Sequence, residues 1–325
     1  MLAPYQTEKF HLSAGPATVE GYPATIDQGR FVNSSGGGFV VPYGHFLESG
    51  WTGSGIRWAV GDEMQAVPER LELRWFSYAD DKFYEGNFLL PQEKMYALLK
   101  QGFWDPVPKR HYTYESFTVC VLPTGGVVVW LGGLRKVVVG RFQAQEIQYD
   151  YARHRPGVDR AASVAQTRGR LPAAVQAEIK AGTLSTKKWE AYLKRYPWKL
   201  ELSRPLTLFN HGIIYRSAEK ASFPLTADGV GFAEEVLDPS PKPVPQSCML
   251  YLAGAYGRQR LLKVKSLDEA ETMGAFQTLA AKHPGQIIAL HVEIDEELKK
   301  ATLSLRAGGQ TLPLTKSTLQ FFDLP

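Results

Sequence analysis

Alternation of apolar and polar side chains marks the clearest strand in the first half of the chain. Within residues 70–78, apolar side chains recur at every second position, which is the period of a strand with one buried face: Leu71, Leu73 and Trp75. Asp80 and Asp81 are expected to form a solvated turn, and residues 83–90 return as a second strand. Pro91 then begins a helix, because proline suits the first helical turn.

A second hairpin is indicated by turn chemistry. Residues 115–122 run into Pro123-Thr124-Gly125-Gly126, and residues 127–131 leave that turn. A strand over 137–147 extends the hairpin into a meander. Further along the chain, helical patterns occur at 171–181 and 185–195, and short strands are predicted at 198–202, 206–209 and 213–215. Residues 148–170 lose periodicity and are predicted to form a long loop.

Four prolines between residues 236 and 247 predict a stiff linker. A compact pattern follows it, with a helix over 268–282 that Ser266 is expected to cap, and with strands at 249–253, 261–265, 287–294, 301–306, 311–314 and 318–322. The predicted fold class is therefore α+β, with a β-rich domain of antiparallel hairpins and a few helices over residues 1–235. A small α+β domain is predicted over residues 248–325.

Composition agrees with this architecture. The 325 residues exceed one ordinary core, and 30 glycines with 21 prolines favour many short strands over a helical bundle. Hydrophobic residues at 44% and charged residues at 22% exclude a disordered chain or a coiled coil. No apolar run is long enough to span a membrane.

Charge argues against a nucleic-acid binder. The formal net charge is only +4, well short of the concentrated positive surface of such proteins. Tyr149 and Tyr151 alternate with Arg153 and Arg155 in the predicted 148–170 loop, a mixture that suits base stacking or a protein interface. Because the net charge is low, protein recognition is the favoured interpretation.

Local signatures of catalysis are few. The sequence lacks a Gly-x-Ser-x-Gly elbow, a His-Glu-x-x-His helix and a phosphate loop, and its seven histidines are dispersed without metal-ligand spacing. Asp80 and Asp81 point apart on a turn, and His154 is a lone histidine among arginines. A triad assembled in space stays open, since its members need not be neighbours in sequence. We expect neither an enzyme nor a bound cofactor or metal.

The two cysteines leave the compartment undecided. Cys120 lies in an alternating apolar run and is expected to be buried, and Cys248 opens another such run. A disulfide between them stays open, because spacing gives no test of geometry. The first residues, Met-Leu-Ala-Pro, show no basic or apolar leader, so we expect no signal peptide here, although a mature fragment of a precursor would look the same.

One set of motifs is distinctive as a combination. Residues 68–86, followed by Leu90-Pro91, resemble the core motif of the bacterial domain-of-unknown-function family 2931. Further blocks follow in that family's order: residues 123–131, 139–144, 189–192, 195–198 and 210–212. The resemblance covers about residues 1–235 and implies no catalytic residues. It places Trp75, Phe83, Tyr84 and Trp130 among the motif residues, and their positions on strands predict that they are core.

Members of this family are commonly envelope lipoproteins, and some look like immunity proteins beside phospholipase toxins of type VI secretion systems. The resemblance therefore implies a protein that binds and neutralises a cognate lipase by covering its lid or active-site entrance. It also implies the periplasm, as the mature part of a secreted or lipid-anchored precursor, with a cytoplasmic protein as the alternative. An envelope protein that binds lipid or glycan through aromatic loops around Trp51 and Trp58 is the second interpretation.

Two clusters are expected to contact the partner. The first lies in the predicted 148–170 loop, and the second lies at the first turn of the C-terminal domain, because buried aromatic and arginine anchors dominate tight interfaces. The expected contact residues are Tyr149, Tyr151, Arg153, His154, Arg155, Tyr256, Arg258 and Arg260.

Overall fold

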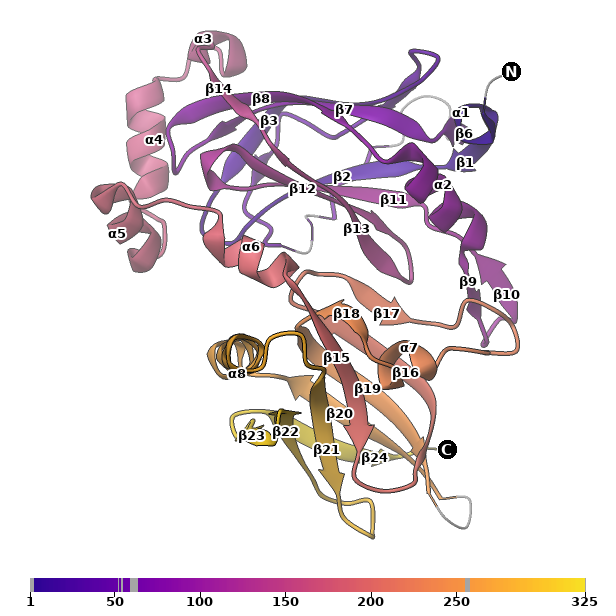
Figure 1. Cartoon of the computed structure of the whole chain (residues 1–325). Helices are drawn as coiled ribbons and strands as arrows, with labels where there is room; N and C mark the ends of the chain where they lie inside the picture. Colours follow the sequence, from indigo (N-terminus) through magenta and orange to yellow (C-terminus); the bar gives the residue numbers. More distant parts are fainter. Residues whose placement is uncertain (1–2, 52, 54, 59–63, 255–257, 325) are drawn as a thin grey trace. The chain divides into compact units, whose positions relative to one another are not determined.

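The chain forms two compact units. The structure is a computed structural model that describes residues 3–51, 53, 55–58, 64–254 and 258–324. Unit 1 comprises Met1–Gly102 and Thr113–Lys188, and unit 2 comprises Phe103–Tyr112 and Trp189–Pro325. Sheets dominate both units, so the expected strand-rich α+β class is confirmed at this level (Figure 1).

Unit 1 contains two larger sheets. The β8 sheet has the order β14-β8-β7-β3-β4, with β5 also on β3, and its strands are β3 (Ala24–Asn33), β4 (Gly38–Val40), β5 (Phe46–Leu47), β7 (Pro68–Ser77), β8 (Lys82–Leu89) and β14 (Gln145–Ile147). The β12 sheet comprises β2 (Ser13–Thr18), β11 (Ser116–Val121), β12 (Gly126–Gly132) and β13 (Lys136–Gln143). β2 runs parallel to β11, and the remaining neighbours in that sheet are antiparallel. A small sheet pairs β1 (Lys9–His11) with β6 (Met64–Ala66).

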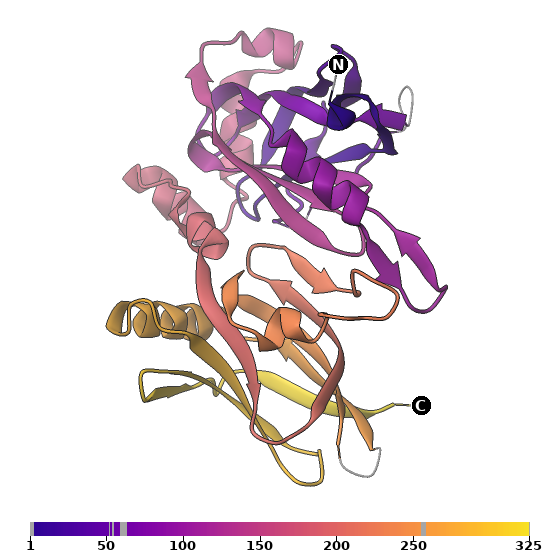
Figure 2. The ribbon, with the colours of Figure 1, turned by 45° about the vertical axis from the view of Figure 1, so that its right-hand side comes forward.

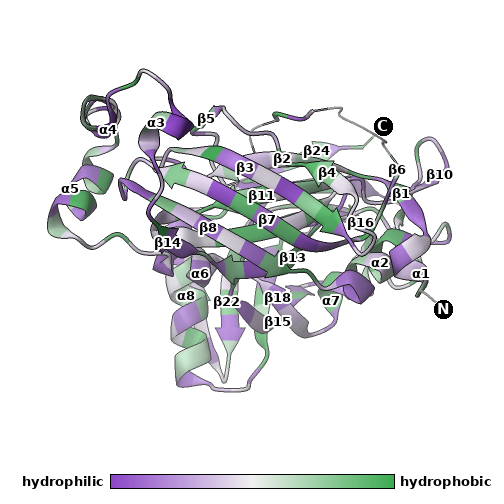
Figure 3. Ribbon diagram, turned by 90° about the horizontal axis from the view of Figure 1, so that it is seen from above, coloured by the Kyte–Doolittle hydropathy of each residue, from purple (hydrophilic) through white to green (hydrophobic). Residues whose placement is uncertain are grey.

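Apolar faces of the two larger sheets form the core of unit 1. Phe31 on β3 packs against Phe117 on β11 with ring centroids 4.7 Å apart. The predicted alternation over Leu71, Leu73 and Trp75 holds, and the hydropathy colouring in Figure 3 alternates along the middle of β7. The four motif residues expected in the core are all buried: Trp75, Phe83, Tyr84 and Trp130. Burial of one such aromatic side chain stabilises the fold by about 2–3 kcal/mol.

The turn between β7 and β8 is less solvated than expected. The Asp80 carboxylate accepts hydrogen bonds from Ser77 Oγ at 2.5 Å and from the Thr124 amide at 3.2 Å, so it joins this turn to the next hairpin. Burial raises the pKa of Asp80, and these hydrogen bonds oppose the rise. Asp81 is the more exposed of the pair, and its Oδ1 accepts a hydrogen bond from Arg160 Nε at 2.8 Å.

Helices of unit 1 include one pair that the sequence did not reveal. The helices are α1 (Pro4–Thr7), α2 (Gln92–Gln101), α3 (Tyr151–His154), α4 (Arg160–Arg168), α5 (Ala173–Ala181) and α6 (Lys187–Leu193), which runs into unit 2. The prediction of a long loop over 148–170 is therefore wrong. The Asp150 and Asp159 side chains cap α3 and α4 by accepting from Ala152 N and Ala162 N.

Unit 2 is also built on two sheets. One has the order β17-β16-β19-β20-β24 and contains β16 (Thr207–Tyr215), β17 (Lys220–Ser222), β19 (Pro245–Ala253), β20 (Gln259–Ser266) and β24 (Thr318–Asp323). The other has the order β18-β15-β21-β22-β23 and contains β15 (Arg195–Leu202), β18 (Ser240–Pro243), β21 (Ile288–Ile294), β22 (Ala301–Ala307) and β23 (Gln310–Pro313). β15 and β21 are parallel.

Helix α8 (Glu269–Lys282) lies along the second of these sheets, as Figure 2 shows. Its Phe276 packs on Tyr196 with ring centroids 5.4 Å apart. Asp268, rather than the predicted Ser266, caps this helix by accepting from the Glu271 amide at 2.9 Å. The remaining elements of unit 2 are α7 (Glu234–Leu237) and the hairpin of β9 (Phe103–Asp105) and β10 (Arg110–Tyr112).

The expected linker is part of unit 2. Residues 236–247 contribute the end of α7, all of β18 and the start of β19, and the Val244 side chain is fully buried. Pro243 accepts a hydrogen bond from Trp198 Nε1 at 3.0 Å. Proline is tolerated here because β18 is an edge strand, where an N–H that points away from the neighbouring strand is not needed for pairing. The units therefore divide near Lys188 rather than at 236–247.

Both cysteines are buried free thiols, so the disulfide left open by the sequence does not form. Burial raises the pKa of the Cys120 thiol and of the Cys248 thiol. Each therefore acts as a small core side chain.

Candidate functional site

A hollow of about 480 Å³ opens on unit 1 where β3, the 43–46 segment and α3 meet, and we call it the aromatic–basic hollow. Its lining residues come from segments more than 100 positions apart in sequence, and they are Thr25, Ile26, Asp27, Tyr43, Gly44, Phe46, His154, Arg155, Pro156 and Val158. The volume lies within the range of small-molecule sites, but aromatic side chains at its rim remain half exposed.

The aromatic rim is held out by a tight turn. Tyr43 and Phe46 are 45% and 44% exposed, respectively. Between them Gly44 has a φ of +77°, a conformation that favours glycine, and its amide donates to Ile26 O at 2.8 Å. Phe46 contacts Tyr78 and Tyr43 contacts Trp58, with ring centroids 5.1 and 4.9 Å apart. The turn thus presents large apolar surface that the folded chain leaves partly in water.

A buried imidazole lies at the wall of the hollow. His154 Nδ1 is 3.1 Å from Asp27 Oδ1, and the His154 side chain is 2% exposed. Burial lowers the pKa of His154, although the hydrogen bond with Asp27 raises it. A neutral ring donates from Nδ1 to the carboxylate, which leaves Nε2 as an acceptor. Among the described residues, Nε2 has no hydrogen-bond partner.

Arg155 supplies the basic part of the hollow. One guanidinium nitrogen donates to the Tyr78 hydroxyl at 3.1 Å, and that hydroxyl lies 3.3 Å from Thr25 Oγ1. The hydrogen bond with Tyr78 raises the pKa of Arg155, which stays charged. Because a guanidinium carries five donors, one bond to Tyr78 leaves most of them for a partner.

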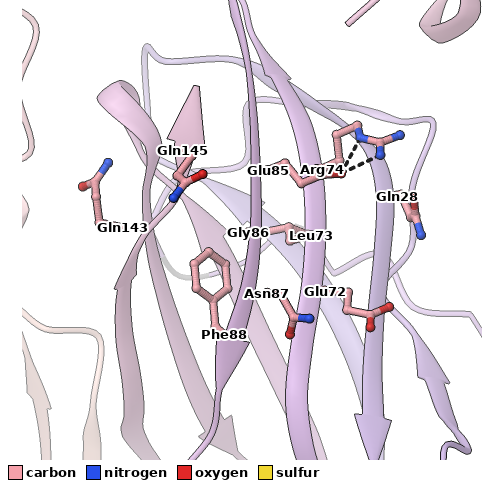
Figure 4. Close-up of a pocket in the computed structure, with 10 residues that line it drawn as sticks. All are labelled: Gln28, Glu72, Leu73, Arg74, Glu85, Gly86, Asn87, Phe88, Gln143 and Gln145. Atoms are coloured by element: carbon pink, nitrogen blue, oxygen red, sulfur yellow. Dashed lines mark hydrogen bonds and ion pairs between the residues drawn. The ribbon is translucent and has the colours of Figure 1, made fainter. Parts of the chain in front are cut away.

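Arg74 connects this hollow to a second depression on the same sheet. Its guanidinium contacts Asp27 at 3.4 Å and Glu85 at 2.5 Å, and it lies over the Tyr149 ring at 4.5 Å. Arg74 and Glu85 are cross-strand neighbours on β7 and β8, a position where opposite charges stabilise a sheet. Figure 4 shows this pair at one end of a depression of about 590 Å³, which we call the polar groove. Its lining residues are Gln28, Glu72, Leu73, Arg74, Glu85, Gly86, Asn87, Phe88, Gln143 and Gln145.

The predicted 149–155 contact residues do lie together, but they divide into two groups. Tyr151 is 6% exposed and belongs to a core cluster with Phe76, Phe83 and Val164. Tyr149 packs on Phe83 with ring centroids 5.1 Å apart. These two tyrosines cover the outer side of the β8 sheet, whereas Arg153 and Arg155 are exposed. The expectation that Tyr151 is a surface contact is therefore not met, because its ring fills the space under α4.

The predicted second cluster is less open than expected. Arg260 is buried on β20, where its guanidinium contacts the Asp323 carboxylate at 2.8 Å. Arg258 is exposed and lines a smaller depression in unit 2. Tyr256 lies outside the described residues. Of the two described residues of this cluster, Arg258 lies on the surface and Arg260 does not.

Sequence reasoning missed the residues that complete the hollow. Asp27, Tyr43 and Phe46 come from a glycine-rich region that gave no local signature, and the hollow exists only when β3 and α3 are side by side. The sequence does contain one signal for α3 and α4. Asp150 and Asp159 are typical N-cap residues, and they indicate helices that begin directly after them.

Comparison with known proteins identifies a family. The family described as "Protein of unknown function (DUF2931)" matches residues 3–186, which is more than half of the chain. The chain belongs to this family. The matched segment ends close to the end of unit 1 at Lys188, so the match is shorter than the expected coverage of about residues 1–235, and the blocks after residue 186 lie outside it. No curated protein and no solved structure matches the chain.

Two features are absent from the described part of this DUF2931 chain. No cluster of three or more His, Cys, Asp or Glu side chains suited to a metal ion occurs among the described residues. In the same residues, no helix is both long and apolar enough to cross a membrane.

Proposed function

We propose that this protein binds and neutralises a partner protein, and that the aromatic–basic hollow is its main contact surface. The observation that carries the proposal is the half-exposed pair Tyr43 and Phe46 beside the charged Arg155. Aromatic and arginine side chains dominate the energetics of protein interfaces, and these three offer apolar area and directed donors within one hollow.

The proposed partner is a cognate lipase or phospholipase toxin of a type VI secretion system. This part rests on the resemblance to family members that look like immunity proteins of such toxins. In the proposed mechanism, the hollow receives a protruding segment of the toxin and covers its lid or substrate entrance. The proposed compartment is the periplasm, where such a toxin meets lipid, and a lipid anchor on the precursor would hold the protein there.

We propose no catalytic step for the chain itself. A carboxylate-oriented imidazole such as His154 with Asp27 is two thirds of a nucleophilic triad, which needs a serine or cysteine in addition. Among the described lining residues of the hollow neither type occurs, and the Thr25 hydroxyl is within hydrogen-bond distance of Tyr78. Hydrolysis of generic ester substrates that disappears in the His154→Gln variant would contradict this part.

A small polar ligand is the second candidate. The polar groove has a volume typical of ligand sites, and its amide and carboxylate side chains are of the kind that bind sugar hydroxyls. A glycan would therefore suit this groove better than a lipid, which needs an enclosed apolar cavity.

The test of the main proposal measures binding of the lipase encoded beside this gene. The double variant Tyr43→Ser/Phe46→Ser and the single variant Arg155→Ala should each raise Kd at least tenfold in calorimetric titration, which corresponds to about 1.4 kcal/mol. Val107→Ser is the matched control, because Val107 is 88% exposed and lies in unit 2. Wild-type affinity in both test variants would exclude the hollow as the contact surface.

A further inference from the structure

The β8 sheet has an open edge along half of one strand. β14 pairs with β8 only through Gln145–Ile147 opposite Phe83–Glu85. The residues just before β14 do not pair with β8. The Ala144 amide donates to Gly125 O at 2.8 Å, and Gln143 pairs with Gly126 on β12. β7 pairs with β8 as far as Leu89. Within the described residues, Gly86–Leu89 therefore has a ladder partner on the β7 side alone.

This edge lacks the features that normally protect an edge strand. Such strands commonly carry lysine, proline or a bulge that prevents another strand from pairing. The open segment reads Gly-Asn-Phe-Leu, without a charged residue or proline, and Leu89 is 71% exposed. An extended chain would therefore find free backbone groups and an apolar side chain in one place.

The polar groove lies against the same edge. Gly86, Asn87 and Phe88 form one side, and Gln143 and Gln145 form the other (Figure 4). Phe88 stacks on Phe142 with ring centroids 4.9 Å apart, which closes the floor towards the core. A methyl group on Gly86 would meet the Phe88 ring at 2.0 Å, so glycine at this position lets the Phe88 ring lie against the strand.

We propose that the Gly86–Leu89 edge and the polar groove bind an extended segment of a protein partner as an added β-strand. The segment carries lysine or arginine at alternate positions. Glu72 lies between Asn87 on β8 and Arg30 on β3. Arg30 donates to Gly36 O at 2.7 Å, and Glu72 forms no ion pair among the described residues, whereas Arg74 is already neutralised by Glu85 and Asp27. Strands are about 4.8 Å apart, so Glu72 lies about 10 Å from the added strand, a gap that a long basic side chain and the glutamate span together.

This inference rests on the proposed function only in that the occupant belongs to a protein. The test therefore uses a peptide instead of the toxin. The probe is the acetylated and amidated peptide Thr-Lys-Val-Lys-Val-Lys-Thr, titrated into ¹⁵N-labelled full-length protein. We expect saturable binding with the largest amide shifts at Gly86–Leu89. The same peptide with alternate amide nitrogens methylated should not bind, because strand addition depends on main-chain hydrogen bonds.

Substitutions on the edge separate this site from the hollow. Asn87→Lys and Leu89→Lys place like charge beside the peptide and should each raise its Kd at least tenfold. Val107→Lys, a change of an exposed apolar residue to lysine in unit 2, should leave the Kd unchanged. Equal binding of the methylated peptide, shifts confined to the aromatic–basic hollow, or no binding at 1 mM peptide would each overturn the inference. Binding of a glucose hexasaccharide in place of the peptide would reassign the groove to carbohydrate and also overturn it. Loss of toxin binding in the hollow variants leaves these outcomes unaffected.

Discussion

At the scale of single residues, Tyr151 and Arg155 lie four positions apart but have different surroundings. The Tyr151 ring packs against Phe76, with centroids 5.1 Å apart, while Arg155 faces the hollow. An aromatic side chain next to arginine occurs equally in interfaces and in cores, so only burial separates the two roles.

The Tyr151→Ala variant should lower the free energy of unfolding by about 3–5 kcal/mol, since it removes a buried ring. Tyr151→Phe keeps the ring and loses a hydrogen bond to Ser163 Oγ at 3.3 Å, so we expect a loss of about 1 kcal/mol or less. Urea denaturation measures both. Arg153→Ala, an exposed neighbour, is the control and should change stability by no more than about 0.5 kcal/mol. A Tyr151→Ala protein as stable as the control would place this ring outside the core.

His154 should make stability depend on pH. Burial lowers its pKa in the folded state, so the unfolded chain takes up the proton first as the pH falls. The stability linked to the neutral ring is fully present above the ordinary imidazole pKa of about 6.5. It is lost as the pH falls below that value through the folded-state pKa. Asp27 and Arg155 are the charged groups that act on this ring.

The measurement is urea denaturation of the wild type and of His154→Gln at pH 7.5, 6.5 and 5.5. The wild type should lose more stability over this range than the variant, whose amide does not titrate. Identical losses in the two proteins would show that His154 is not the responsible group.

At the scale of elements, the sequence predicted strands that bury one face, such as β7, but not the short helices α3 and α4, which cover the outer side of a sheet. The alternation in β7 holds from Leu71 to Trp75, where one face packs in the core, so the β7–β8 hairpin could be predicted directly. The segment of α3 and α4 has short helices interrupted by Pro156 and Gly157, which hid any helical period. The hollow could not be predicted from local sequence patterns either, because Asp27 contacts His154 only after α3 packs on the sheet.

α4 is expected to be essential to this covering arrangement. Val164 is its buried side chain, and the Arg168 guanidinium donates to Tyr78 O and Ala79 O at 3.0 and 2.7 Å. Val164→Asp should therefore destabilise unit 1 by about 3 kcal/mol, because it buries an unpaired carboxylate among aromatic rings. Ala165→Asp on the exposed side of the same helix is the control and should cost only a few tenths of a kcal/mol. Equal thermal midpoints for the two variants would mean that α4 does not cover the sheet.

At the scale of the whole molecule, proline content misplaced the boundary between units. A proline-rich stretch suggests a linker when it is considered alone, but edge strands also accept proline, and β18 is one. The C-terminal strands and α8 were nevertheless predicted nearly as they occur. What the sequence did not reveal is that residues 189–247 complete the sheets of these C-terminal strands, since the paired residues of β15 and β21 are 90 positions apart.

Truncation at residue 247 should consequently fail. It removes β20–β24 and most of β19, and with them β21, the ladder partner of β15, and β19, the ladder partner of β16. We expect a soluble yield at least tenfold lower than that of the full chain and loss of the dispersed amide spectrum of residues 189–247. A well-folded 1–247 fragment with wild-type dispersion in that region would restore the linker hypothesis.

The β9–β10 hairpin gives synthesis of this protein an unusual order of events. Residues 103–112 belong to unit 2 but are translated in the middle of unit 1, and the buried Phe103 has its surroundings in a unit whose main part begins at Trp189. At about 5–20 residues per second, the 137 residues from 189 to 325 take roughly 7–27 seconds to emerge. During that time unit 1 can fold while Phe103 and Trp104 remain exposed at the ribosome. The nascent chain thus carries an aromatic segment open to a chaperone or to aggregation until its last strand has been made.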